Sequence, residues 1–112
     1  LDVGFLDEGG AKPDPSTWPG ALIAFYRGQL SEEEVRKAAL SADPLTERGQ
    51  RCEADFYIAE WHLLRYDSEV ARQLFERAAG ECPHSFIEFE MASVELRRLL
   101  PKAALAQQPS AQ

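Results

Sequence analysis

Residues 52–83 constrain the fold of this 112-residue chain more than any other part of it. They form two amphipathic segments around a short turn at Tyr66, and their apolar side chains recur at the three-to-four spacing of helices that bury one face. Ala59 and Ala71 are small, so two antiparallel helices can approach closely there. Pro83 cannot continue the second helix and closes the unit. The stretch therefore predicts a helical hairpin and an all-α fold.

This hairpin resembles a tetratricopeptide repeat, a two-helix unit of about 34 residues. Ile58-Ala59 stands in the Leu-Gly slot of the repeat, His62 in its Tyr slot, and residues 71–75 supply Ala-x-x-x-Phe. Asp55 stands where the repeat pattern has Trp, which weakens one packing contact and leaves the register intact. The resemblance implies a short solenoid, a fragment of a right-handed superhelix, which serves as a binding scaffold.

Turn and cap signals predict three more helices outside the hairpin. Ser16 or Thr17 is expected to cap the first helix, and Ser31 opens a capping box for the second. Asp43-Pro44 is expected to open the third helix, and Ser68 to cap the fourth. The five helices are expected over about 17–27, 31–41, 45–65, 68–80 and 86–100. The predicted organisation is an extended arm over 1–16, a degenerate first hairpin over 17–42, the full repeat over 45–83, a capping helix over 86–100 and a disordered tail over 101–112.

Three phrases extend the resemblance beyond the general repeat. They read TWPGALIAFYRGQL, ERGQRCEADFYIAEW and CPHSFIEFEMASVELRRL, and they cover roughly residues 16–100. Together they are similar to NlpI-like bacterial repeat proteins, which are cell-envelope lipoproteins that dimerise and act as adaptors for proteases and cell-wall hydrolases. The resemblance implies an adaptor of the bacterial cell envelope or periplasm, and without it a cytoplasmic location stays open.

Charge and hydropathy exclude several classes of partner. The formal net charge of −7 argues against binding a nucleic acid or an anionic membrane surface. Apolar residues make up 45% of the chain, which is typical of a globular domain. No apolar run approaches the roughly 18 residues that a membrane span requires, so we expect no direct membrane insertion.

The chain lacks the residue patterns of a catalytic or metal site. No nucleophile is paired with a base, and no glycine-rich phosphate loop precedes a helix. His62 falls in a core position of its helix, where we expect it to be a satisfied core residue. His84 lies beside Cys82, but a Cys-x-His pair falls short of the four ligands of a zinc site. The sequence therefore predicts no catalytic residue, no cofactor and no metal.

The two cysteines are expected at the same end of the central hairpin. Cys52 lies 14 residues before Tyr66, and Cys82 lies 15 residues after Asp67. An antiparallel hairpin brings such positions together, so a Cys52–Cys82 disulfide is sterically allowed. The alternative is two separate thiols in a reducing cytoplasm.

The first helix of each repeat lines the inner face of a solenoid. The residues expected to bind a partner on that face are Glu53, Phe56, Tyr57, Glu60, Leu64, Glu90, Val94 and Arg97. Their aromatic and acidic side chains suit a protein segment with apolar and basic residues. In the alternative, Phe56 and Tyr57 only pack on the first hairpin or on the N-terminal arm.

The sequence therefore predicts a non-enzymatic protein-interaction or adaptor module with a protein or peptide partner. The alternative is a self-association module, a homodimer in which Trp18, Phe25 and Tyr26 are buried against a second copy. An enzyme subunit with a site around Cys82 and His84 is the less favoured alternative.

Overall fold

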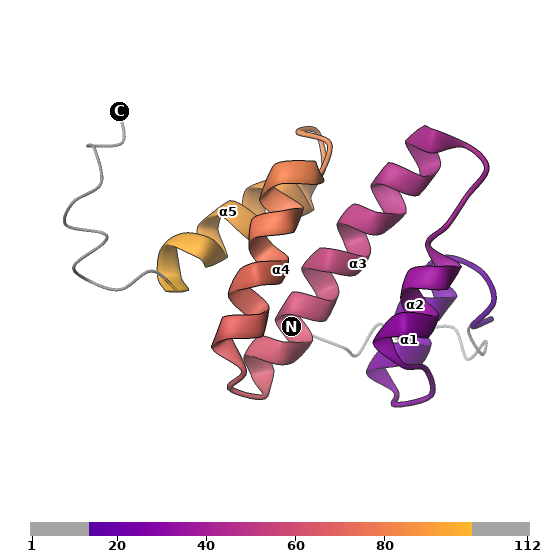
Figure 1. The fold of residues 1–112 in the computed structure, drawn as a ribbon, viewed down its shortest axis with the longest axis horizontal. Coiled ribbons are helices and arrows are strands. Elements are labelled where there is room, and N and C mark those ends of the chain that lie inside the picture. The colour runs from indigo at the N-terminus through magenta and orange to yellow at the C-terminus, as the bar shows by residue number, and fades with distance from the viewer. Residues whose placement is uncertain (1–13, 100–112) are drawn as a thin grey trace.

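The computed structural model describes residues 14–99, which form five α-helices and contain no strand (Figure 1). The helices are α1 (Gly20–Tyr26), α2 (Glu32–Ala38), α3 (Pro44–Leu64), α4 (Ser68–Glu81) and α5 (Ile87–Leu99). The predicted all-α class is thus confirmed for the described part of the chain. Most of the predicted N-terminal arm and the whole predicted tail over 101–112 lie outside the described residues.

The second and third helices begin at the caps that the sequence predicts. At the start of α2, the Ser31 hydroxyl accepts from the Glu34 backbone N–H at 3.2 Å, and a Glu34 carboxylate oxygen accepts from the Ser31 N–H at 2.9 Å. At the start of α3, Asp43 accepts from the Thr46 N–H at 3.2 Å and Pro44 is the first helical residue. Both caps satisfy backbone donors that a helix leaves without a partner.

The first helix starts later than predicted, at Gly20 and not near Thr17. The Asp14 carboxylate accepts from the backbone N–H and the hydroxyl of Ser16, at 2.9 and 2.7 Å, so this serine is held in a turn and does not cap the helix. A Cβ atom at Gly20 would lie 2.0 Å from the Asp14 carbonyl oxygen. The helix therefore begins at the residue that has no side chain to collide with this turn.

The turn between α3 and α4 is built around Tyr66, whose φ of 63° lies in the left-handed region. Glycine adopts this region without steric cost, whereas a residue with a Cβ, such as Tyr66, is disfavoured there. Ser68, predicted as the cap of the next helix, is instead the first residue of α4, and Asp67 takes the cap position. The Asp67 carboxylate lies 3.2 Å from Nδ1 of His62 at the end of α3.

The central feature of the fold is the antiparallel hairpin of α3 and α4 (Figure 1). The shorter helices α1 and α2 pack on α3, while α5 packs on α4 and also contacts α3. The central hairpin therefore has the small hairpin of α1 and α2 on one side and the single helix α5 on the other.

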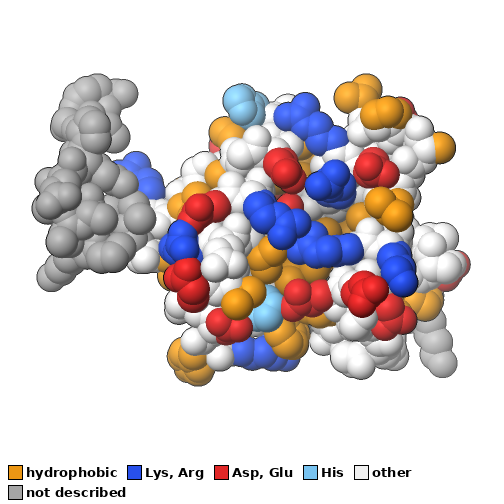
Figure 2. All heavy atoms as spheres, viewed as in Figure 1, with side chains coloured by type: hydrophobic (Ala, Val, Ile, Leu, Met, Phe, Trp, Pro, Cys, Tyr) orange, Lys and Arg blue, Asp and Glu red, His pale blue; other side chains and the backbone are white. Residues whose placement is uncertain are grey.

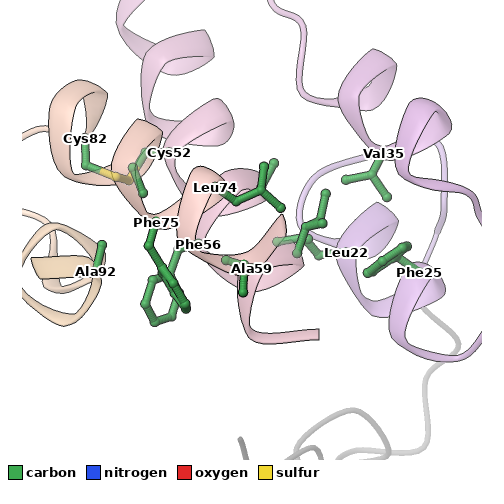
Figure 3. Close-up of a cluster of buried hydrophobic side chains, with 14 residues drawn as sticks. Leu22, Phe25, Val35, Cys52, Phe56, Ala59, Leu74, Phe75, Cys82 and Ala92 are labelled. Atoms are coloured by element: carbon green, nitrogen blue, oxygen red, sulfur yellow. A yellow bond between two sulfur atoms is a disulfide. The ribbon is translucent and has the colours of Figure 1, made fainter. Parts of the chain in front are cut away.

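One continuous core runs through all five helices (Figure 3). The first hairpin contributes Phe25 and Val35, and α5 contributes Ala92. The rings of Phe56 and Phe75 meet edge to face at the centre, with centroids 5.7 Å apart. The small residues expected at the helix crossing, Ala59 and Ala71, are fully buried. Half-buried Trp61 extends the core onto α1 through a tilted contact with Phe25, at 5.1 Å between centroids.

Candidate partner-binding face

A groove of about 440 Å³ lies between α3 and α5. Its described lining residues are Glu60, Glu90, Met91, Val94, Glu95 and Arg98. We call the three acidic residues at positions 60, 90 and 95 the groove carboxylates. The groove therefore joins apolar side chains of α5 to carboxylates of both helices.

The outer side of α5 carries a row of exposed apolar side chains next to this groove. Ile87, Met91 and Val94 are 58%, 40% and 50% exposed, and their spacing of four and three residues places them on one side of the helix. We call these three residues the α5 stripe. The opposite side of α5 packs into the core through Phe89, Ala92, Leu96 and Leu99. α5 thus has two apolar sides, of which residues 14–99 bury one.

Electrostatic repulsion is concentrated at Glu60 inside the groove. Burial, and after it the neighbouring Glu95 carboxylate, raises the pKa of Glu60 from its ordinary value of 4.5 to about 7. The Glu95 side chain is 13% exposed and pairs with Arg98 at 3.1 Å. Among the described residues that line the groove, Arg98 is the sole cation. The described lining of the groove therefore carries more acidic than basic side chains.

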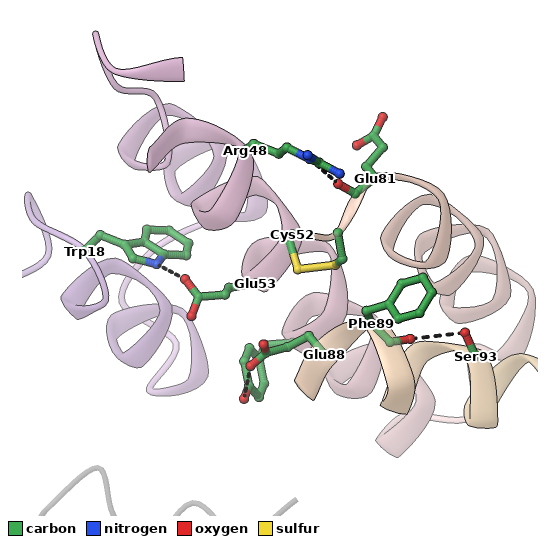
Figure 4. The surroundings of a disulfide bond; sticks show 10 residues. Trp18, Arg48, Cys52, Glu53, Glu81, Glu88, Phe89 and Ser93 are labelled. Atoms are coloured by element: carbon green, nitrogen blue, oxygen red, sulfur yellow. Dashed lines mark hydrogen bonds between the residues drawn. A yellow bond between two sulfur atoms is a disulfide. The ribbon is translucent and has the colours of Figure 1, made fainter. Parts of the chain in front are cut away.

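A second group of acidic and aromatic side chains ties α1 and α5 to α3. Trp18 Nε1 donates to Glu53 Oε1 at 2.9 Å, and the Tyr57 hydroxyl donates to Glu88 Oε2 at 3.0 Å (Figure 4). The Tyr26 hydroxyl donates to the Tyr57 carbonyl oxygen at 2.6 Å. Burial raises the pKa of Glu53 above its ordinary value, and burial together with Glu88 raises the pKa of Tyr57 to about 12. These side chains hold helices together.

Seven of the eight residues predicted to bind a partner fall into three groups. Glu60, Glu90 and Val94 line the groove. Leu64 and Arg97 are exposed but lie outside the groove lining. Glu53 and Tyr57 form the internal hydrogen bonds just described. For Tyr57 this agrees with the alternative prediction, in which the residue packs on the first hairpin.

The prediction for Phe56 is corrected. Its side chain is fully buried, with its ring against Phe75 of α4, so it cannot contact a partner. Helical spacing places Phe56 close to the inner face, but the hairpin turns that part of α3 toward α4. Sequence reasoning also missed Met91, Glu95 and Arg98, although the apolar spacing of positions 87, 91 and 94 was a readable signal.

Asp55 has a role that the repeat pattern did not predict. Its side chain is 1% exposed, and Oδ1 lies 2.8 Å from Arg36 on α2 and 3.2 Å from Arg77 on α4. The other oxygen, Oδ2, is buried without a hydrogen-bond partner among the described residues. Burial raises the pKa of Asp55 above its ordinary value, against the effect of the two arginines. Asp55 thus makes an ionic contact between three helices, α2, α3 and α4.

This contact lies on a different face from the groove. Figure 2 shows Lys and Arg side chains gathered over α3, between α2 and α4. At one end of this region, Arg48 Nε donates to the Glu81 carbonyl oxygen at 2.9 Å and Arg51 lies 4.0 Å from the Glu81 carboxylate. α3 therefore presents basic neighbours on one side and the groove carboxylates on another.

Cys52 and Cys82 are joined in a disulfide at the open end of the central hairpin, with Cα atoms 4.8 Å apart (Figure 4). They lie at the same end, as the residue count from the turn predicts. Cys82 in this bond has no thiolate for catalysis or metal binding. His84 stacks on Phe89 with centroids 4.2 Å apart.

His62 has a partner at each ring nitrogen. Nε2 contacts Glu32 Oε1 on α2, and Nδ1 contacts the Asp67 carboxylate. The side chain is 13% exposed, in agreement with the predicted role as a satisfied core residue. Within residues 14–99, no group of three or more His, Cys, Asp or Glu residues is arranged to hold a metal ion.

No protein-family model and no solved structure matches this chain. Within residues 14–99, none of the helices combines the length and the hydropathy that crossing a membrane requires.

Proposed function

We propose that this chain is a non-enzymatic protein-interaction module that binds a protein or peptide partner at the groove between α3 and α5. The observation that carries the proposal is the α5 stripe, three large apolar side chains that are each at least 40% exposed on one side of a helix. Isolated exposed apolar residues are normal on protein surfaces, but a contiguous row beside a groove is typical of an interaction site.

The arrangement of the helices supports a tetratricopeptide-like solenoid. α5 packs against both helices of the preceding hairpin, as the first helix of a following repeat would. In a repeat array the outer side of such a helix is covered by the next unit. The α5 stripe occupies the side that a next unit would cover.

The disulfide supports an adaptor that works in an oxidising compartment, such as the bacterial cell envelope. Disulfides persist outside the cytosol and are rare within it. The enzyme alternative is less favoured because it needs a reactive Cys82, and Cys82 is paired with Cys52. The aromatic version of self-association is also less favoured, since Trp18, Phe25 and Tyr26 make contacts within the chain.

Selection of binders from a displayed library of random peptides tests this proposal. We expect selected peptides to bind the disulfide-bonded protein and to lose affinity for the double variant Met91→Ser/Val94→Ser. Leu45→Ser is the matched control, because Leu45 is a 77% exposed apolar residue of α3 outside the groove lining. Peptides that bind both variants with the affinity they have for the wild type would show that α5 is not the binding face.

A further inference from the structure

The pattern of the α5 stripe restricts the kind of partner that fits it. With a rise of 1.5 Å per residue, Ile87 and Val94 lie roughly 10 Å apart along the helix axis, with Met91 between them. A row of this length matches two turns of another helix. We propose that the partner segment is an amphipathic helix that lies along α5, with apolar side chains on the α5 stripe and Lys or Arg side chains against the groove carboxylates. This inference rests on the proposed function.

The secondary structure of the face favours a helix over an extended peptide. An extended peptide gains affinity by pairing its backbone with a sheet edge, and residues 14–99 contain no strand. The backbone groups of α5 are used within the helix, so an extended segment would have only side-chain contacts. The main packing partners of α5 among the described elements are helices, α4 and α3. A partner helix would continue this helix-on-helix packing.

The charge of the groove favours a basic partner. Three carboxylates line it, at Glu60, Glu90 and Glu95, and the described cation of the lining, Arg98, already pairs with Glu95. Two of these acidic side chains are partly buried, where charges attract an opposite charge more strongly than in bulk water. The whole chain adds to this effect through its net charge of −7.

The same charges disfavour a second copy as the occupant. In a two-fold dimer the same surface meets itself, so the stripe of one copy faces the stripe of the other. Antiparallel α5 helices that bring Met91 against Val94 also bring Glu90 of each copy opposite Glu95 of the other. Like charges so placed oppose association. A helix that carries Lys or Arg at those positions meets no such repulsion.

The test uses two displayed peptide libraries of about 18 residues, a length at which a helix can form on binding. In the first library, apolar residues stand at helical spacing and the flanking positions vary freely between Lys and Glu. In the second library, the same residues stand at alternating spacing, which is typical of an extended strand. The target is the disulfide-bonded protein, and the dissociation constants of selected clones are measured by fluorescence anisotropy.

We expect enrichment from the helical library alone, with Lys enriched over Glu. The dissociation constant of a selected clone should rise at least about tenfold on Met91→Ser/Val94→Ser, the effect of losing about 1.4 kcal/mol of apolar contact. It should rise several-fold on Glu60→Gln/Glu90→Gln, and it should be unchanged on Leu45→Ser. Circular dichroism of each variant verifies that these surface changes leave the fold intact.

Each other outcome overturns a different statement. Enrichment of Glu over Lys overturns the basic partner. Clones from the alternating library that depend on Met91 and Val94 overturn the helix and leave the proposed function standing. Clones whose affinity does not depend on Met91 and Val94 overturn the proposed function as well. A concentration-dependent dimer that Met91→Ser/Val94→Ser abolishes, without peptide binding, assigns the stripe to a second copy.

Discussion

At the scale of single residues, Glu60 makes the stability of the fold depend on pH. Its pKa in the folded protein is about 7, above the ordinary 4.5, first because of burial and then because of Glu95. A group whose pKa is raised on folding contributes stability in full below its unfolded pKa and loses it as the pH rises through the folded pKa. The contribution of Glu60 should therefore disappear between about pH 4.5 and pH 7.

We expect Glu60→Gln to flatten the decline in stability over this range. The urea midpoint of the wild type should fall relative to that of the variant as the pH rises from about 5 to about 8. Glu90→Gln, at an exposed position of the same groove, is the control and should run parallel to the wild type. Parallel curves for Glu60→Gln and the wild type would show that this carboxyl is not perturbed.

The ionic contact at Asp55 predicts a second effect at this scale. Arg36→Met leaves the buried carboxylate with Arg77 alone, at the longer distance of 3.2 Å. Losing one partner of a fully buried pair costs about 3 to 5 kcal/mol, and the 31% exposure of Arg36 reduces this to about 1 to 3 kcal/mol. Lys37→Met, at a 73% exposed neighbour, should change the free energy of unfolding little. Equal effects of the two changes in urea titrations would contradict this account.

Residue-level structure could be predicted where it is local. The Ser31 capping box and the Asp43 cap join atoms within three residues, so the sequence alone contains both partners. The partner of Asp55 on α2 is 19 residues away, and no spacing rule connects them. The sequence showed only that Asp55 is an acidic residue in an apolar row. Comparison with the repeat pattern predicted a weakened packing contact there.

At the scale of elements, the turn between α3 and α4 contains backbone strain at Tyr66 that a substitution can relieve. Tyr66 is 94% exposed and adopts a φ of 63°, which costs a residue with a Cβ roughly 1 to 2 kcal/mol. Tyr66→Gly loses no packing and should raise the free energy of unfolding by roughly 0.5 to 1 kcal/mol after the entropy cost of glycine. Thermal unfolding measures the change. Arg65→Gly, where φ is −103°, should be destabilising, and a fall in the melting temperature for Tyr66→Gly would refute the argument.

Four of the five helices could be located from caps, turns and proline, because these signals act within one turn of the chain. The start of α1 could not, since it depends on the approach of Gly20 to the Asp14 carbonyl, a contact that no local preference determines. The buried side of α3 was misjudged at Phe56 for a similar reason. Helical spacing tells which residues share a side, but the neighbouring helices decide which side is covered.

At the scale of the whole molecule, the disulfide fastens the end of α4 to α3, 30 residues away in sequence. Closing a loop of this length should stabilise the protein by about 3 to 4 kcal/mol. We expect Cys52→Ser/Cys82→Ser to lower the free energy of unfolding by that amount. A reducing agent should destabilise the wild type and leave the variant unchanged. Two titratable thiols in the protein oxidised in air would contradict the bond.

The all-α class and the central hairpin could be predicted because amphipathic spacing, small residues and the closing proline all agree over residues 52–83. The candidate site was predicted in part, through Glu60, Glu90 and Val94. Met91 was missed because it has the same hydropathy as a core residue. Its exposure follows from the packing of α5, whose outer side contacts no other helix of the described residues.

The central claim is that α5 and the facing part of α3 receive the partner. Amide chemical shifts of the isotope-labelled protein, recorded during titration with a peptide selected from the helical library, test it most directly. We predict that the largest shifts fall on residues 87–98 and around Glu60. Shifts concentrated around Arg36 and Arg77, on the basic face between α2 and α4, would contradict the account.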